Sequence, residues 1–111
     1  MPYVNLETNQ NIENREEVMS GLSSLISREL GKPEKYIMVS LDKKALFFAG
    51  SETPAAFVEV KSIGFPGDDL SGVSAALCSF LEEKTGIPSE HIYIVFEDVP
   101  RSRWGWDGST F

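Results

Sequence analysis

GKPEKYIMVSL, residues 31–41, returns at residues 86–96 as GIPSEHIYIVF. In both copies a glycine stands two positions before a proline, and a run rich in β-branched and aromatic residues follows. Glycine readily takes the left-handed conformation that ends many helices, and proline cannot continue a helix. The apolar run after it is typical of a strand. Each copy therefore predicts the end of a helix, a turn and a strand.

The residues before each copy repeat as well and have the spacing of an amphipathic helix. The apolar positions that share one helical face are Val18, Leu22, Leu25 and Ile26 in the first half and Leu70, Val73, Leu77, Phe80 and Leu81 in the second. Asn11 or Asn14 is suited to cap the first helix and Asp68 the second. Gly31 and Gly86 stand where a left-handed C-cap is expected.

A strand precedes each helix, because Val4 and Leu6 match Val58 and Val60. The sequence thus predicts a duplicated β-α-β unit, residues 1–53 and 54–111, within a single domain of residues 1–111. Right-handed crossovers place both helices on one face of a four-stranded mixed sheet, which gives an α/β (α+β) fold. We expect short extra strands at residues 45–50 and after a turn at Asp107-Gly108.

The two faces of this sheet differ in what they would contact. The side chains expected to face the helices are Ile37, Val39, Leu41, Ile92, Ile94 and Phe96. The other face would carry Met38, Ser40, Tyr93 and Val95, which is too apolar a set to leave in water. A partner subunit is the simplest cover for it.

Composition excludes several classes of function. The net charge of −7 repels phosphate backbones and anionic bilayers, so nucleic-acid and membrane binding are disfavoured. Cys78 is the only cysteine and His91 the only histidine, which leaves no intrachain disulfide and makes a zinc site improbable. No run reaches the ~20 apolar residues of a membrane span, and no signal peptide is evident. A cytoplasmic protein is expected.

Pro2, directly behind Met1, is the first candidate functional residue. Removal of Met1 would leave a free secondary amine. An α-amino group titrates near pH 8, and burial or a nearby cation lowers that pKa, so such an amine can act as a base near neutral pH. The alternative is that Pro2 merely begins an edge strand, where its missing N–H does no harm.

Several motifs together resemble the macrophage migration inhibitory factor family of the tautomerase superfamily. They are Pro2, Gly31-Lys32-Pro33 ahead of Tyr36-Ile37, Ser62-Ile63-Gly64, and Gly105-Trp106 ahead of Ser109-Thr110-Phe111, in this order along the whole chain. The resemblance implies a homotrimer whose active sites lie at the subunit boundaries. It also implies keto–enol tautomerisation without a metal or organic cofactor.

The resemblance assigns a role to individual residues. Pro2 would be the catalytic base, with Lys32 holding the substrate carboxylate and helping to keep the proline unprotonated. The backbone N–H of Ile63 would hold the same carboxylate, and Tyr93 would reach in from the adjacent subunit. Trp106 and Phe111 are similar to aromatic residues at the mouth of the pocket. Without the resemblance, Lys32 is a solvated lysine at a helix end, Ile63 a core residue, Tyr93 a strand aromatic, and Trp106 and Phe111 a clasp on a neighbouring subunit.

The chain also departs from the family pattern. Residues 55–58, AAFV, replace a C-x-x-C motif, so thiol-disulfide chemistry is unsupported. Val95 replaces an asparagine, which removes a hydrogen-bonding group at the aryl end of the pocket. Trp104 stands where a small aliphatic residue is common. Arg101 and Arg103 have no clear counterpart and bring positive charge to the rim.

The function predicted from the sequence is keto–enol tautomerisation of arylpyruvates such as phenylpyruvate. The alternatives are a cytokine-like protein that binds a receptor, with non-classical secretion, and a trimer that binds a small molecule without catalysis. Hydration or dehalogenation of small unsaturated acids also remains open, because these reactions use the same proline with different partners.

Overall fold

The structure, a computed structural model, describes residues 1–111. Its elements in chain order are β1 (Tyr3–Thr8), α1 (Arg15–Leu30), η1 (Glu34–Tyr36), β2 (Met38–Lys43), β3 (Ala56–Ser62), α2 (Ser71–Thr85), η2 (Ser89–His91), β4 (Ile92–Asp98), η3 (Arg101–Arg103), β5 (Gly105–Trp106) and β6 (Ser109–Thr110). The elements labelled η are single turns of 3₁₀-helix.

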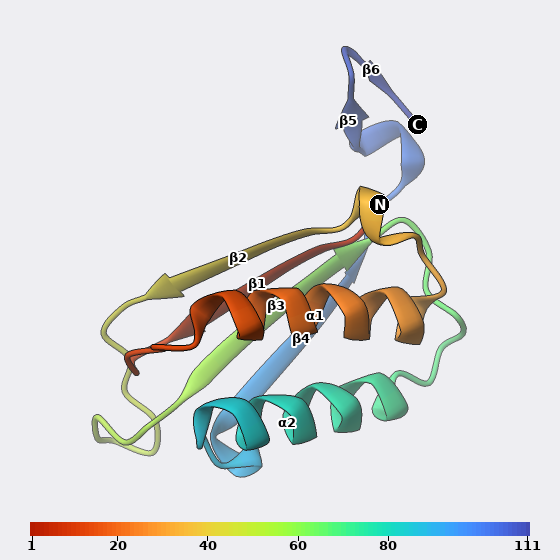
Figure 1. Cartoon of the computed structure of the whole chain (residues 1–111). Coiled ribbons are helices and arrows are strands. Elements are labelled where there is room, and N and C mark those ends of the chain that lie inside the picture. Colours follow the sequence, from red (N-terminus) through yellow and green to blue (C-terminus); the bar gives the residue numbers. More distant parts are fainter.

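The four long strands form one mixed sheet in the order β2-β1-β3-β4 (Figure 1). β1 pairs with β2 in parallel, β3 pairs with β4 in parallel, and the two pairs meet through antiparallel β1 and β3. Each parallel pair is joined by one helix, so the two β-α-β units of the sequence repeat lie side by side. The predicted fold class is confirmed.

Both helices pack on the same face of the sheet, as Figure 1 shows. Between helices and sheet lies a core of fully buried side chains, which includes Val4, Leu6, Val58 and Val60 from the strands and Val18, Leu22, Ile26, Leu77 and Leu81 from the helices. Burial of each such side chain is worth about 1.5–3 kcal/mol, so the alternation along β1 and β3 fixes which face of the sheet meets the helices.

The helix ends follow the prediction at the C-terminus and depart from it at the N-terminus. Gly31 and Gly86 both have left-handed backbones, with φ of 65° and 77°. Asn14 is the residue before α1, but its side chain donates to the carbonyl of Lys84 instead of capping the helix. The predicted cap by Asp68 is wrong, because α2 begins at Ser71 and the carboxylate of Asp69 accepts the Ser71 N–H at 3.0 Å.

The predicted strand at residues 45–50 is also wrong. Ala49 and Gly50 have φ of 54° and 80°, and these positive angles turn the chain back so that Phe48 bonds to Ser51. Only isolated bridge contacts form there. The side chain of Asn9 holds this segment from within, donating to the carbonyls of Leu46 and Thr53 at 3.1 and 2.8 Å.

The C-terminal residues form the predicted hairpin of β5 and β6. Asp107 and Gly108 make its turn with φ of 50° and 79°, the positive angles that a two-residue hairpin needs. The hairpin projects beyond the end of the sheet at which the N-terminus lies (Figure 1). Neither helix has the length and apolar character required to cross a bilayer.

The sheet face away from the helices is open and partly apolar. Met38, Tyr93 and Val95 expose 67%, 61% and 49% of their surface. Polar groups lie beside them: the Ser40 hydroxyl donates to Asn5 Oδ1 at 2.7 Å and lies 2.7 Å from the Tyr3 hydroxyl. Since the Ser40 proton is used on Asn5, Tyr3 is the donor in the second bond.

Candidate active site

Pro2 lies at the start of an interior strand and is less than 2% exposed. β1 is flanked on both sides, by β2 and β3, so the explanation of Pro2 as the start of an edge strand is wrong. The Pro2 carbonyl accepts the N–H of Met38 at 3.1 Å, which fixes the residue against β2. Its position is therefore set by the sheet, while the bond to Met1 points toward the hairpin end of the molecule.

Lys32 is brought to the same end by the turn that follows α1. Gly31 reverses the chain, and the N–H of Lys32 bonds back to the Ser27 carbonyl at 3.1 Å. The Lys32 ammonium group then donates to the backbone carbonyl of Ile63 at 3.0 Å. Ile63 directly follows β3, so this bond ties the turn after α1 in the first unit to the end of β3 in the second.

A cavity of about 280 Å³ brings together four of the residues singled out in the sequence: Lys32, Ile63, Trp106 and Phe111. We call it the Lys32 cavity. Met1, Tyr36 and Arg101 complete its lining. Tyr36 was not identified as a site residue, because an aromatic residue before a strand has no chemical signal of its own.

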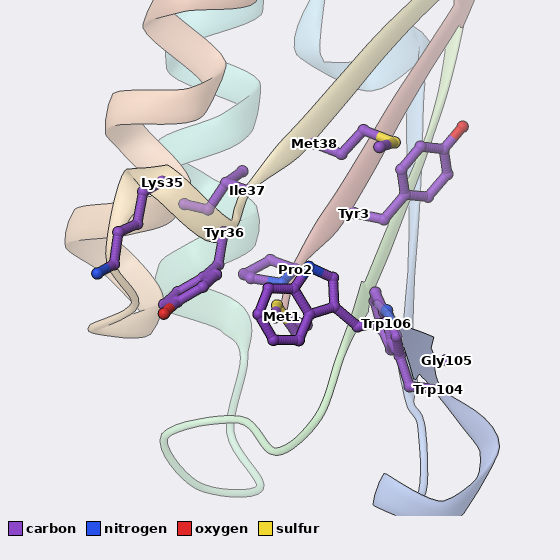
Figure 2. A pocket seen from close by; sticks show the side chains of 10 residues that line it. All are labelled: Met1, Pro2, Tyr3, Lys35, Tyr36, Ile37, Met38, Trp104, Gly105 and Trp106. Carbon is purple, nitrogen blue, oxygen red and sulfur yellow. The ribbon is translucent and has the colours of Figure 1, made fainter. Parts of the chain in front are cut away.

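A second cavity of about 410 Å³ lies in front of Pro2, and we call it the Pro2 cavity. Trp104 and Trp106 line it together with Met1, Pro2 and Tyr36 (Figure 2). Lys35 also lines it, although Figure 2 shows its amino group directed away from Pro2. The two cavities share Met1, Tyr36 and Trp106, so they meet at these side chains.

Aromatic contacts hold the hairpin over this end of the sheet. The Trp106 ring packs edge-on against Tyr36, with centroids 6.2 Å apart, and stacks on Phe111 at 5.9 Å. The N–H of Phe111 bonds to the Trp104 carbonyl at 3.2 Å. These contacts give the Lys32 cavity an apolar wall.

The electrostatics at the N-terminus favour a neutral amine. Partial burial lowers the pKa of the Met1 amino group, and the positive charges of Lys32 and then Arg101 lower it further. Desolvation and charge repulsion are different causes, but both act in the same direction because each disfavours the protonated form. Elsewhere, no group of three or more His, Cys, Asp or Glu side chains is placed to hold a metal ion.

Tyr93 and Val95 lie apart from these cavities within one chain. Tyr93 pairs in register with Phe57, which pairs with Glu7, whereas Pro2 precedes the opposite end of β1. The Tyr93 ring instead packs against Phe48 at 5.4 Å. Both residues lie exposed on the open face of the sheet.

Comparison with known proteins assigns the chain to a family. The family model for macrophage migration inhibitory factor matches residues 1–111. A macrophage migration inhibitory factor homologue of Trichuris trichiura is 36% identical, with all of both chains covered. Two solved structures are also similar. One is a macrophage migration inhibitory factor homologue from Prochlorococcus marinus, with TM-score 0.92 and 42% identity over 98% of each chain. The other is the macrophage migration inhibitory factor from Trichinella spiralis, with TM-score 0.89 and 35% identity over 98% of this chain and 99% of that one. The chain belongs to the macrophage migration inhibitory factor family of the tautomerase superfamily.

Proposed function

We propose that the protein is a keto–enol tautomerase of arylpyruvates such as phenylpyruvate, with Pro2 as the catalytic base after removal of Met1. The observation that carries the proposal is the setting of the Met1 amine: burial, Lys32 and Arg101 lower its pKa, and Met1 lines both cavities. After removal of Met1, the Pro2 amine would be exposed to the same cations. Membership of the tautomerase superfamily supports the reaction class.

Met1 lines both cavities, so its removal would open the space in front of Pro2 as well as free the nitrogen. The neutral Pro2 amine would take a proton from the carbon next to the ketone. The protonated amine would then return a proton to the ketone oxygen to give the enol. The reverse sequence converts enol to ketone, and no redox partner is required.

Lys32 is suited to the negative charge that develops in this reaction. Its ammonium group is held by the Ile63 carbonyl and still has two further N–H donors for a carboxylate. Donors fixed in advance stabilise an enolate-like transition state more than donors that must reorganise. We place the substrate carboxylate beside Lys32 and Ile63, with its aryl ring against the wall formed by Trp106 and Phe111.

A homotrimer would complete this site. Tyr93 and Val95 are exposed on the open sheet face and lie far from Pro2 in their own chain, so a neighbouring subunit would supply them. Val95 has no polar group, and burying a para-hydroxyl beside it costs about 1–3 kcal/mol unless Tyr93 or water bonds to it. We therefore expect phenylpyruvate to be preferred over its para-hydroxy analogue.

Receptor binding is the second candidate function, favoured by the names of the relatives, which are macrophage migration inhibitory factors. Receptor binding and catalysis rest on different observations, so the protein can have both functions. Binding to an immobilised receptor ectodomain is measured for the wild type and for Pro2→Ala. Equal binding by the two proteins would show that receptor binding does not depend on turnover.

The proposed activity is tested on two preparations of the same chain. Intact-mass spectrometry first establishes which preparation retains Met1, and phenylpyruvate tautomerisation is then followed by the absorbance of the enol. We expect turnover only where Met1 is absent, and Pro2→Ala to lower turnover by about 10²–10⁴-fold, as for loss of a general base. Equal turnover with and without Met1 would exclude Pro2 as the base.

A further inference from the structure

Arg101 lines the Lys32 cavity, although nothing in the proposed reaction uses it. It is the first residue of η3 and follows Pro100. Its place is set by the sheet, because the Val99 N–H bonds to the carbonyl of Ser62 at 2.8 Å and the Trp104 N–H bonds to the Arg101 carbonyl at 3.3 Å. These bonds hold η3 beside the end of β3, where Ile63 accepts its bond from Lys32.

Neither Arg101 nor Lys32 has a carboxylate partner. The ion pairs of the chain use Arg28, Lys44, Lys61 and Lys84 instead. The nearest acidic residue along the chain from Arg101 is Asp98, and its carboxylate is occupied by the N–H of Gly64 at 3.0 Å. Two uncompensated cations therefore border one cavity of about 280 Å³ in a chain of net charge −7.

A ligand with one carboxylate compensates only one of these cations. A ligand with two carboxylates compensates both, and guanidinium groups bind carboxylates through paired N–H donors. The Met1 amine provides a second sign that both charges reach the cavity, since each of them lowers its pKa. We therefore expect the cavity to select ligands by their charge as well as by their shape.

We propose that Arg101 is a specificity-determining residue that selects aromatic 2-oxo acids carrying a second carboxylate on the ring. Lys32 and Ile63 hold the carboxylate next to the ketone, and Arg101 binds the carboxylate at the far end of the substrate. This inference rests on the proposed tautomerase function, because the dicarboxylate is a substrate only if the protein is a tautomerase. The binding preference itself does not depend on turnover.

The first experiment measures binding without catalysis. Terephthalate, with two carboxylates, and benzoate, with one, are titrated into the Met1-free protein by calorimetry. We expect terephthalate to bind about three- to tenfold more tightly than benzoate, the range for a partly exposed charged hydrogen bond. Arg101→Gln should abolish the difference. Arg103→Gln, which removes the same charge from the same short helix but lines a different cavity, should retain it.

The second experiment measures kcat/KM for phenylpyruvate, for 4-carboxyphenylpyruvate and for the compound whose ring carboxylate is a methyl ester. This ester keeps the carboxylate next to the ketone and matches the bulk of the ring substituent without its charge. The 4-carboxy compound should exceed its ester by about three- to tenfold in the wild type and lose that advantage in Arg101→Gln. Equal binding of terephthalate and benzoate, or an advantage that survives Arg101→Gln, overturns the proposal. Turnover of none of the three substrates, with the terephthalate preference intact, would overturn the tautomerase function and leave the anion site of Arg101 standing.

Discussion

Lys32 shows how one side chain can serve two purposes at once. Its ammonium group contacts the Ile63 carbonyl, which fixes its position, and its charge lowers the pKa of the amine at the N-terminus. In the proposed reaction, the charge that would bind the substrate carboxylate would also keep the base neutral. Substitution of this residue should therefore change both affinity and pH dependence.

Lys32→Gln should move the rising limb of the pH profile of kcat/KM to higher pH. The sign follows from the proposed base: a cation disfavours the protonated amine, so its removal raises the amine pKa, and a higher pH is then needed to free the base. The maximal kcat/KM should also fall by about 10–100-fold through the lost carboxylate contact. Lys32→Arg, which keeps the charge, is the control and should leave the limb in place. A profile that does not move in Lys32→Gln would remove this lysine from control of the base.

The sequence predicted which residues lie together better than it predicted their contacts. Lys32, Ile63, Trp106 and Phe111 were named from their motifs, and all four line one cavity. That Lys32 would bond to the carbonyl of Ile63, from the second unit, depends on how two distant turns meet and has no sequence signal. Arg101 was noted only as rim charge, because its approach to Lys32 is set by the hydrogen bond between Val99 and Ser62.

Gly21 of α1 lies against the ring of Phe80 in α2. A Cβ atom built there would lie 2.3 Å from Cζ of Phe80, far inside van der Waals contact. Glycine within a helix lowers stability by about 1 kcal/mol relative to alanine. Packing against Phe80 explains why glycine nevertheless occupies this position. The close approach of α1 to α2 is what requires glycine at this position.

Gly21→Ala should destabilise the fold, because about 1–3 kcal/mol of overpacking against Phe80 exceeds the gain of about 1 kcal/mol in helix propensity. The same change in a Phe80→Leu background, where the ring is gone, should instead be neutral or stabilising. Chemical denaturation of the four proteins gives the coupling energy directly. Additive effects in the two backgrounds would show that the ring moves aside without cost.

Elements with periodic apolar residues were predicted well, and elements set by the path of the backbone were not. Both helices, the four long strands and the Asp107-Gly108 turn have local signals that agree with the fold. Residues 45–50 have the composition of a strand, yet the positive φ of Ala49 turns them back on themselves. An alanine gives no warning of that conformation, which the side chain of Asn9 stabilises from another part of the chain.

At the scale of the whole molecule, the open sheet face separates the residues of the proposed site. One chain holds Pro2 and Lys32 at one end of the sheet, whereas Tyr93 lies toward the other end and is 61% exposed. A single subunit therefore cannot bring Tyr93 to its own cavity without breaking the register of β4 against β3. The proposed trimer resolves this by having each site use two chains.

Mixing two defective variants should then restore activity. Lys32→Gln damages the half of the site that one chain supplies and Tyr93→Ala the half that its neighbour supplies, so each homotrimer has three damaged sites. If the two proteins are unfolded together and refolded as a one-to-one mixture, about a quarter of the sites in random trimers combine an intact Lys32 with an intact Tyr93. We expect about a quarter of wild-type kcat/KM from the mixture, with light scattering used to verify that trimers have re-formed. Each variant refolded alone is the control, and the two mixed after separate refolding should show only the average of their residual activities. Re-formed mixed trimers with no gain over that average would mean that Lys32 and Tyr93 act within one chain or that Tyr93 takes no part, and the shared site would have to be abandoned.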